Sequence, residues 1–150
     1  MGFYSMCVEY QIISSLRLVY VEMPKALSIE ELISHLEELA ANEDYLPPMK
    51  KIVDFSNLAD AAMPRYDMAG FDRLKALYSS ELRGEHCVFV TPTDFRYGMG
   101  RLFDGYMDNA PFEVSVARSL QEALELLDIN ENEFRACQGG TAMQSNRNRA

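Results

Sequence analysis

The sequence has no tryptophan, only two histidines and three cysteines, and no long apolar run. The cysteines, Cys7, Cys87 and Cys137, are odd in number and widely spaced, which disfavours a disulfide framework and indicates a reducing compartment. No apolar stretch approaches the roughly 18 residues of a membrane-spanning helix, and the N-terminus lacks the features of a signal peptide. We therefore expect a cytoplasmic protein with no integral membrane segment.

Basic residues are also scarce, since 14 Lys and Arg stand against 23 Asp and Glu, for a formal net charge of −9. Contact with phosphates needs a basic surface that releases counterions, so this balance disfavours nucleic acid and anionic membranes as partners. A surplus of acidic residues mostly reports solubility.

Catalytic residue types are poorly represented. His35 falls in a predicted helix and His86 at the start of a predicted strand, with no metal-ligand spacing and no evident pair of nucleophile and base. We therefore predict no metal, no cofactor, no catalytic residue and no enzyme activity. A hydrolase or transferase that uses Asp54 is the weakest alternative, because a single Asp at the end of a strand more often accepts loop hydrogen bonds.

The composition itself is that of a globular domain, with 48% hydrophobic and 25% charged residues in 150. We place one α/β domain over residues 1–130. Residues 131–150 become polar, through Gln138-Gly139-Gly140 and the basic pair Arg147 and Arg149, and are expected to form a flexible tail.

Hydrophobic periodicity predicts the elements of that domain. Apolar runs over Met6–Ile13 and Leu16–Met23, separated by Ser14-Ser15, predict an antiparallel hairpin. A capping box of Ser28 and Glu31 predicts a helix to Asn42.

The later elements alternate between strand and helix. Strands are expected at Lys51–Phe55, Cys87–Val90 and Phe112–Ala117, and helices through Met68–Leu77, from the cap Thr93 through Tyr106, and after the cap Ser119. The order β-β-α-β-α-β-α-β-α predicts a mixed, mainly parallel five-stranded sheet with four helices.

This order, with Val53-Asp54-Phe55-Ser56 and the closing Ser119–Leu124 segment, resembles the STAS-like proteins related to the sporulation anti-sigma factor antagonist, and in particular their SpoIIAA-like, STAS/SEC14-type branch. Cys87–Val90 and Tyr97-Gly98-Met99-Gly100-Arg101 are similar to that branch as well. The resemblance implies a module for protein partners or apolar ligands rather than catalysis. It also departs from the family, because Arg65–Gly70 stands where the antagonists carry a phosphorylated serine and holds no Ser or Thr.

The carboxyl ends of parallel strands meet at one edge of a sheet, where helix N-termini also point. We expect the binding residues there, on the loops that follow the third and fourth strands: Asn57, Met63, Arg65, Tyr66, Thr93, Asp94, Arg96, Tyr97 and Arg101. The alternative is that Thr93 and Asp94 only cap a helix, and that Tyr97 and Arg101 only face water.

Two functions are compatible with these features. The first is a non-enzymatic STAS-like module that binds a protein partner or itself without the phosphoserine switch. The second is a carrier or sensor of an apolar, lipid-like molecule in a cleft between the second and third helices, because those helices are rich in methionine and aromatic residues. The same side chains could instead form only the core.

Overall fold

The computed structural model describes residues 8–58, 68–94, 98, 113–140 and 144–145. These residues form one sheet in the order β5-β4-β3-β2-β1-β6. The strands are β1 (Glu9–Ile13), β2 (Leu18–Glu22), β3 (Lys50–Asp54), β4 (His86–Val90), β5 (Glu113–Ala117) and the two-residue β6 (Gln144–Ser145). Strands β2 to β5 are parallel, whereas β1 pairs antiparallel with both β2 and β6.

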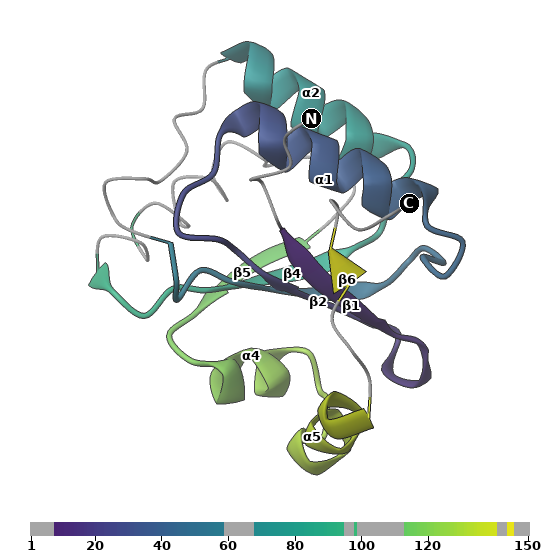
Figure 1. Ribbon diagram of the computed structural model, residues 1–150, viewed down its shortest axis with the longest axis vertical. Coiled ribbons are helices and arrows are strands. Elements are labelled where there is room, and N and C mark those ends of the chain that lie inside the picture. The colour runs from purple at the N-terminus through teal and green to yellow at the C-terminus, as the bar shows by residue number, and fades with distance from the viewer. Residues whose placement is uncertain (1–7, 59–67, 95–97, 99–112, 141–143, 146–150) are drawn as a thin grey trace.

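Helices cover both faces of this sheet (Figure 1). Helices α1 (Ile29–Ala41) and α2 (Met68–Ser79) lie side by side on one face, and α4 (Leu120–Leu126) and α5 (Glu131–Gly140) lie on the other. Because strand residues alternate between faces, each central strand contributes to two cores. The α1–α2 side holds Val21, Val53 and Cys87, and the α4–α5 side holds Ile52, Val88 and Phe134.

The predicted helix caps at Ser28 and Ser119 are present. The Ser28 hydroxyl accepts from the Glu31 N–H at 3.1 Å while the Glu31 carboxylate accepts from the Ser28 N–H at 2.9 Å, so the capping box is complete. At α4 the Ser119 hydroxyl accepts from the Glu122 N–H, but the Glu122 carboxylate accepts from the N–H of the preceding Arg118. Both caps satisfy backbone donors that the first turn of a helix leaves open.

The hairpin turn is longer than predicted. A 3-10 turn over Ser14–Leu16 is followed by Arg17 in the left-handed region, with φ of 51°, where the sequence suggested a turn of two serines. The Arg17 guanidinium donates to the carbonyl oxygens of Leu46 and Pro48, at 2.8 Å each. These contacts tie the turn to the loop after α1 and help hold a conformation that is unfavourable for a side-chain-bearing residue.

The expected flexible tail over 131–150 is wrong for its first half, because residues 131–140 form helix α5. The Asn130 side chain accepts from the Glu133 N–H at 3.0 Å and caps this helix. Phe134 is buried and packs edge-on against Tyr20, with ring centroids 5.4 Å apart. A single aromatic anchor and a cap therefore order a segment whose average composition is polar.

The α/β class and the mixed, mainly parallel sheet are confirmed, and β6 extends the five longer strands by a sixth. The predicted helix after Thr93 falls almost entirely outside the described residues, as does the start of the first predicted strand at Met6. Of the helices in the described ranges, none has the length and apolar character needed to cross a membrane.

Candidate functional site

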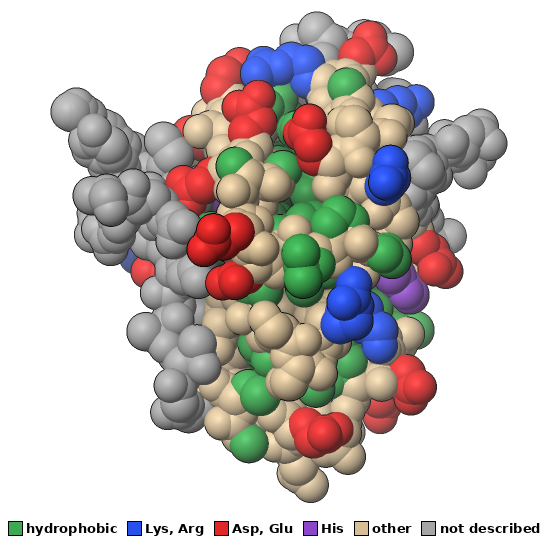
Figure 2. All heavy atoms as spheres, turned by 90° about the vertical axis from the view of Figure 1, so that its right-hand side faces the viewer, with side chains coloured by type: hydrophobic (Ala, Val, Ile, Leu, Met, Phe, Trp, Pro, Cys, Tyr) green, Lys and Arg blue, Asp and Glu red, His purple; other side chains and the backbone are tan. Residues whose placement is uncertain are grey.

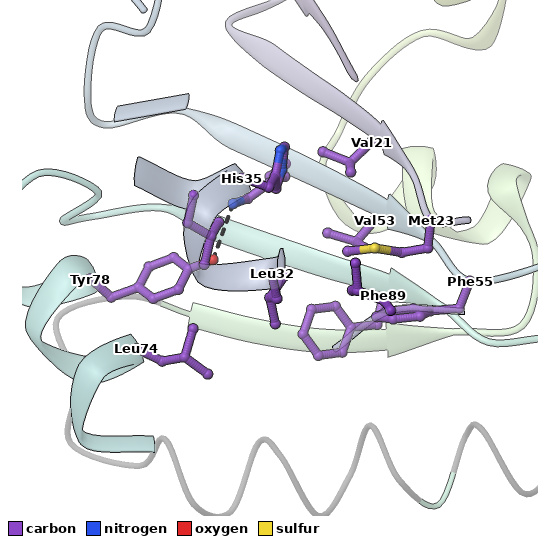
Figure 3. A pocket seen from close by; sticks show the side chains of 12 residues that line it. Val21, Met23, Leu32, His35, Val53, Phe55, Leu74, Tyr78 and Phe89 are labelled. Atoms are coloured by element: carbon purple, nitrogen blue, oxygen red, sulfur yellow. Dashed lines mark hydrogen bonds between the residues drawn. The ribbon is translucent and has the colours of Figure 1, made fainter. Parts of the chain in front are cut away.

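A cavity lies between α1, α2 and the face of the sheet that they cover (Figure 3). Its volume is about 30 Å³. Apolar side chains form most of its wall, together with His35, Lys51 and Tyr78; the apolar lining is Val21, Met23, Leu27, Leu32, Leu36, Val53, Phe55, Leu74 and Phe89. An apolar cavity with a few polar groups at one end is the usual form of a small-molecule site.

Strand alternation places these groups. Lys51 and Val53 on β3 point toward the helices, while Lys50, one residue earlier, lies on the opposite face and donates to the Leu127 carbonyl oxygen at 2.7 Å. In Figure 3 His35 and Tyr78 lie at one end of the cavity. Met23, Phe55 and Phe89 lie at the other end, toward the carboxyl ends of the strands. The cavity thus has a polar end and an apolar end.

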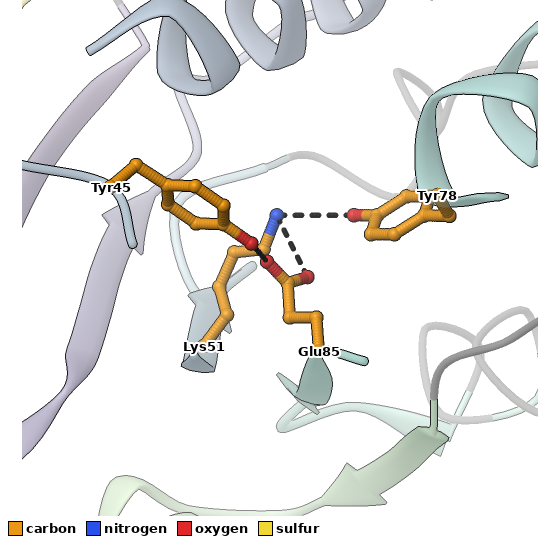
Figure 4. A network of polar contacts seen from close by, with 4 residues as sticks. All are labelled: Tyr45, Lys51, Tyr78 and Glu85. Carbon is orange, nitrogen blue, oxygen red and sulfur yellow. Dashed lines mark hydrogen bonds and ion pairs between the residues drawn. The ribbon is translucent and has the colours of Figure 1, made fainter. Parts of the chain in front are cut away.

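The polar end belongs to a buried network of four residues (Figure 4). The Lys51 ammonium lies 3.1 Å from Glu85 Oε1 and donates to the Tyr78 hydroxyl at 3.1 Å. The Tyr45 hydroxyl donates to Glu85 Oε2 at 2.7 Å. The side chains of Lys51 and Glu85 are 1% and 0% exposed, so the ion pair is fully removed from water. Isolated charges would be very costly at such depth, and the mutual contacts offset that cost.

The network also controls its neighbours. Burial raises the pKa of the Tyr78 hydroxyl well above its ordinary value, and the negative charge of Glu85 adds to the shift. Burial and the charge of Glu85 raise the pKa of Tyr45 in the same way. Burial also raises the pKa of the Cys87 thiol, although the charge of Lys51 opposes the shift. At neutral pH these groups are uncharged, so Cys87 is not a reactive thiolate.

This arrangement suits recognition of a hydrogen-bond acceptor. Within the described residues the Lys51 ammonium donates to the Tyr78 hydroxyl and forms an ion pair with Glu85, and the same side chain lines the cavity. An ammonium carries three donor protons, so a lysine at this position suits an acceptor. His35 is buried at the same end and packs edge-on against Tyr10, with ring centroids 5.4 Å apart.

A second hollow lies at the surface and is lined by Pro47, Pro48, Arg83 and Gly84, with a volume of about 390 Å³. Figure 2 faces the C-terminal ends of α1 and α2 and shows hydrophobic side chains gathered between acidic and basic ones. The hollow is open to solvent and, unlike the cavity, is not enclosed by convergent polar groups. The cavity is therefore the stronger candidate site.

The predicted site residues that the structure describes follow two neighbouring strands at the carboxyl edge of the sheet. Asn57 is exposed after β3, and Thr93 and Asp94 follow the adjacent strand β4. The Asp94 carboxylate forms an ion pair of 2.8 Å with Arg118, just before α4. The other predicted residues fall outside the described ranges: Met63, Arg65, Tyr66, Arg96, Tyr97 and Arg101.

Asp54, the acid of the weakest alternative, is a hydrogen-bond acceptor in the structure. Its Oδ1 accepts from the backbone N–H and the hydroxyl of Ser56, at 2.9 and 2.5 Å. Its Oδ2 accepts from the Tyr20 hydroxyl at 3.2 Å. Burial raises the pKa of Tyr20, and the negative charge of Asp54 adds a smaller shift in the same direction. These contacts fit the loop-acceptor interpretation of Asp54.

Sequence reasoning missed the polar end of the cavity. The available signal was Lys51, a cation within an apolar strand at the same alternation position as the buried Val53. The contacts of Lys51 with Glu85 and Tyr78, and of Glu85 with Tyr45, join segments far apart in the chain, so no local sequence spacing predicts them.

Comparison with known proteins returned no matching family model, no matching curated protein and no matching solved structure. The STAS-like resemblance therefore stays a prediction.

Proposed function

We propose that this protein binds a small molecule with an apolar body and a hydrogen-bond acceptor at one end, in the cavity between α1, α2 and the sheet. The observation that carries the proposal is the convergence of Lys51, His35 and Tyr78 on an otherwise apolar cavity. An acceptor such as a carboxylate or carbonyl would bind the ammonium of Lys51. The apolar body would extend toward Met23, Phe55 and Phe89.

The size of the cavity sets a condition on this function. A volume of about 30 Å³ holds one or two water molecules, which is too little for a hydrocarbon chain. Binding therefore requires side chains, or α1 and α2, to move apart, and the free energy gained from apolar contacts with the ligand must exceed the cost of that movement.

This proposed site differs from the cleft that the sequence suggested. The cavity is bounded by the first and second helices, whereas the sequence-based cleft lies between the second and third.

The test uses octanoate, and octanol as a probe with the same chain but no charge. Native mass spectrometry and thermal unfolding should show one octanoate bound per chain and a concentration-dependent rise in Tm. Lys51→Met should abolish the preference for octanoate over octanol. Lys50→Met is the matched control, since it removes a lysine from the same strand on the opposite face.

If Lys51→Met fails to fold, the milder Tyr78→Phe variant replaces it in the comparison of the two probes. It keeps the ring and removes one acceptor of the Lys51 ammonium. An unchanged Tm with both probes, and an apo mass in several gentle preparations from native cells, would contradict the proposal. So would equal octanoate binding by the wild type and the folded Lys51→Met variant.

A second candidate function is the predicted interaction module, in which the carboxyl edge of the sheet binds a protein partner or a second copy. The observation that favours it is the exposure of Asn57 and Asp94 on neighbouring exits of β3 and β4. Sedimentation velocity across a wide concentration range, and co-purification from native cells, should differ between the wild type and Asn57→Lys with Asp94→Lys. Identical sedimentation and identical co-purified proteins would reject it, with Glu125→Lys on the exposed side of α4 as the charge control.

A further inference from the structure

A serine, a histidine and a glutamate meet on the sheet face opposite the cavity. His86 Nε2 lies 3.2 Å from Ser115 Oγ, and His86 Nδ1 lies 3.6 Å from Glu113 Oε1. Register accounts for the meeting: His86 on β4 pairs with Glu113 on β5, and Ser115 is two residues further along β5 on the same face. Each ring nitrogen of His86 thus has its own oxygen neighbour.

The three residues are accessible to small molecules. The side chain of His86 is 27% exposed and that of Glu113 is 73% exposed, while Ser115 is half-buried. Strand β5 is the terminal strand of the sheet on this side, so the group lies at the edge. A base that touches the nucleophile on one side and an orienting carboxylate on the other is the arrangement that activates serine in hydrolases of unrelated folds.

We propose that Ser115 and His86 form a nucleophile and general base that react with small carboxylic esters, with Glu113 as a positioning residue. The proposal is independent of ligand binding in the cavity. The Ser115–His86 distance is already within hydrogen-bonding range. The His86–Glu113 distance is longer, but such contacts often tighten only when substrate binds, and the exposed Glu113 side chain has room to rotate.

The reaction balances without a metal, an oxidant or a cofactor. Ser115 Oγ attacks the ester carbonyl carbon while its proton moves to His86 Nε2, and the bond to the alkoxide then breaks as Nε2 protonates that leaving group. Water next attacks the acyl–Ser115 ester, gives its proton to Nε2 and releases the carboxylic acid, and Ser115 recovers its proton. The step requires the tautomer with the proton on Nδ1, which a carboxylate at the position of Glu113 favours.

This constellation was not expected from the sequence, in which His86 and Ser115 are separated by the segment between β4 and β5. It also lies near the amino-terminal ends of the parallel strands, whereas the predicted site residues follow their carboxyl ends. The constellation and the predicted site residues therefore lie at different ends of the parallel strands.

The experiment incubates the full chain with p-nitrophenyl acetate and locates the acetyl group by peptide mass spectrometry. We expect acetylation of Ser115, with a rate constant that falls about 10²-fold or more in His86→Gln because general-base catalysis is lost. Glu113→Gln should lower the rate constant of acetylation without changing the ester concentration that gives half of the maximal rate. Glu113→Asp should restore part of the rate constant. Ser80→Ala is the matched control, since among the described residues the Ser80 hydroxyl donates to backbone carbonyl oxygens in the last turns of the preceding α2, Ala76 at 2.9 Å and Leu77 at 3.5 Å.

Acetyl groups found only on lysines, or equal Ser115 acetylation in the wild type and His86→Gln, would overturn the proposal. A fluorophosphonate probe on the unmodified wild-type chain covers the case in which a variant fails to fold. Labelling of Ser115 ahead of Ser80 would support the proposal, and labelling of neither would reject it.

Discussion

Removing one partner of the buried Lys51–Glu85 pair should destabilise the protein severely. Lys51→Met leaves the Glu85 carboxylate, which is 0% exposed, without its cation, although the Tyr45 hydroxyl still donates to it at 2.7 Å. Breaking a buried pair in this way costs about 3–5 kcal/mol. Folded domains have only about 5–15 kcal/mol of stability in total, so the loss is a large share.

Urea unfolding followed by circular dichroism measures this loss, and a double-mutant cycle isolates the pair. Glu85→Leu alone should also cost about 3–5 kcal/mol, whereas Lys51→Met with Glu85→Leu together should cost much less than the sum, because no charge stays buried. Lys50→Met, on the same strand but half-buried, should cost about 1 kcal/mol for its one hydrogen bond.

Additivity of the two single losses would refute this reasoning, since it would mean that the two charges do not interact in the folded state. A change in the denaturant slope together with the midpoint would instead point to an altered unfolded state, so both are compared across the four proteins.

Three further predictions concern other parts of the fold. Gly84→Ala should destabilise the protein by about 1–2 kcal/mol in urea unfolding, because Gly84 has φ of 77° and a Cβ there would lie 3.0 Å from a proline Cβ; an unchanged midpoint would contradict this. Phe134→Ala should cost about 3–5 kcal/mol, and hydrogen exchange should rise first over residues 131–140; exchange unchanged there would argue against anchoring by this ring. The free energy of unfolding should fall above pH 10 by about 1.4 kcal/mol per pH unit for each buried tyrosine. The reason is that the pKa values of Tyr20, Tyr45 and Tyr78 are raised only in the folded state, so the unfolded chain loses these protons first. A flat profile from pH 10 to 11 would contradict the shifts.

The fold was largely predictable where local signals decide it. The alternation in the first hairpin, the capping box at Ser28 and the apolar run of β4 each use neighbouring residues, and each led to the correct element. The signals failed at Arg17, whose left-handed backbone depends on a guanidinium contact with a distant loop. They also failed at α5, where Asn130 as cap and Phe134 as anchor were outweighed by the polar average of the segment.

The candidate sites were less predictable because they join distant segments. Lys51 and Tyr78 meet only once α2 packs on β3, and His86 and Ser115 meet only in the register of β4 with β5. Neither pair has a sequence spacing from which the contact could be predicted. A shift of one residue along β3 decides which face a lysine lies on, since Lys50 contacts the carbonyl oxygen of Leu127 beyond α4 while Lys51 lines the cavity.

The buried network also links the stability of the protein to the proposed ligand. Lys51 connects β3, helix α2 through Tyr78 and the loops that carry Glu85 and Tyr45. An acceptor that binds Lys51 shares the ammonium with Glu85 and Tyr78, while its apolar body parts the helices that these residues hold. An anionic ligand should therefore gain less affinity from its charge than an isolated lysine would give, because the charge of Lys51 is already neutralised by Glu85. Octanoate should accordingly raise the Tm of a folded Glu85→Gln variant by more than it raises that of the wild type. An equal rise in Tm would mean that ligand binding does not depend on the Lys51–Glu85 ion pair.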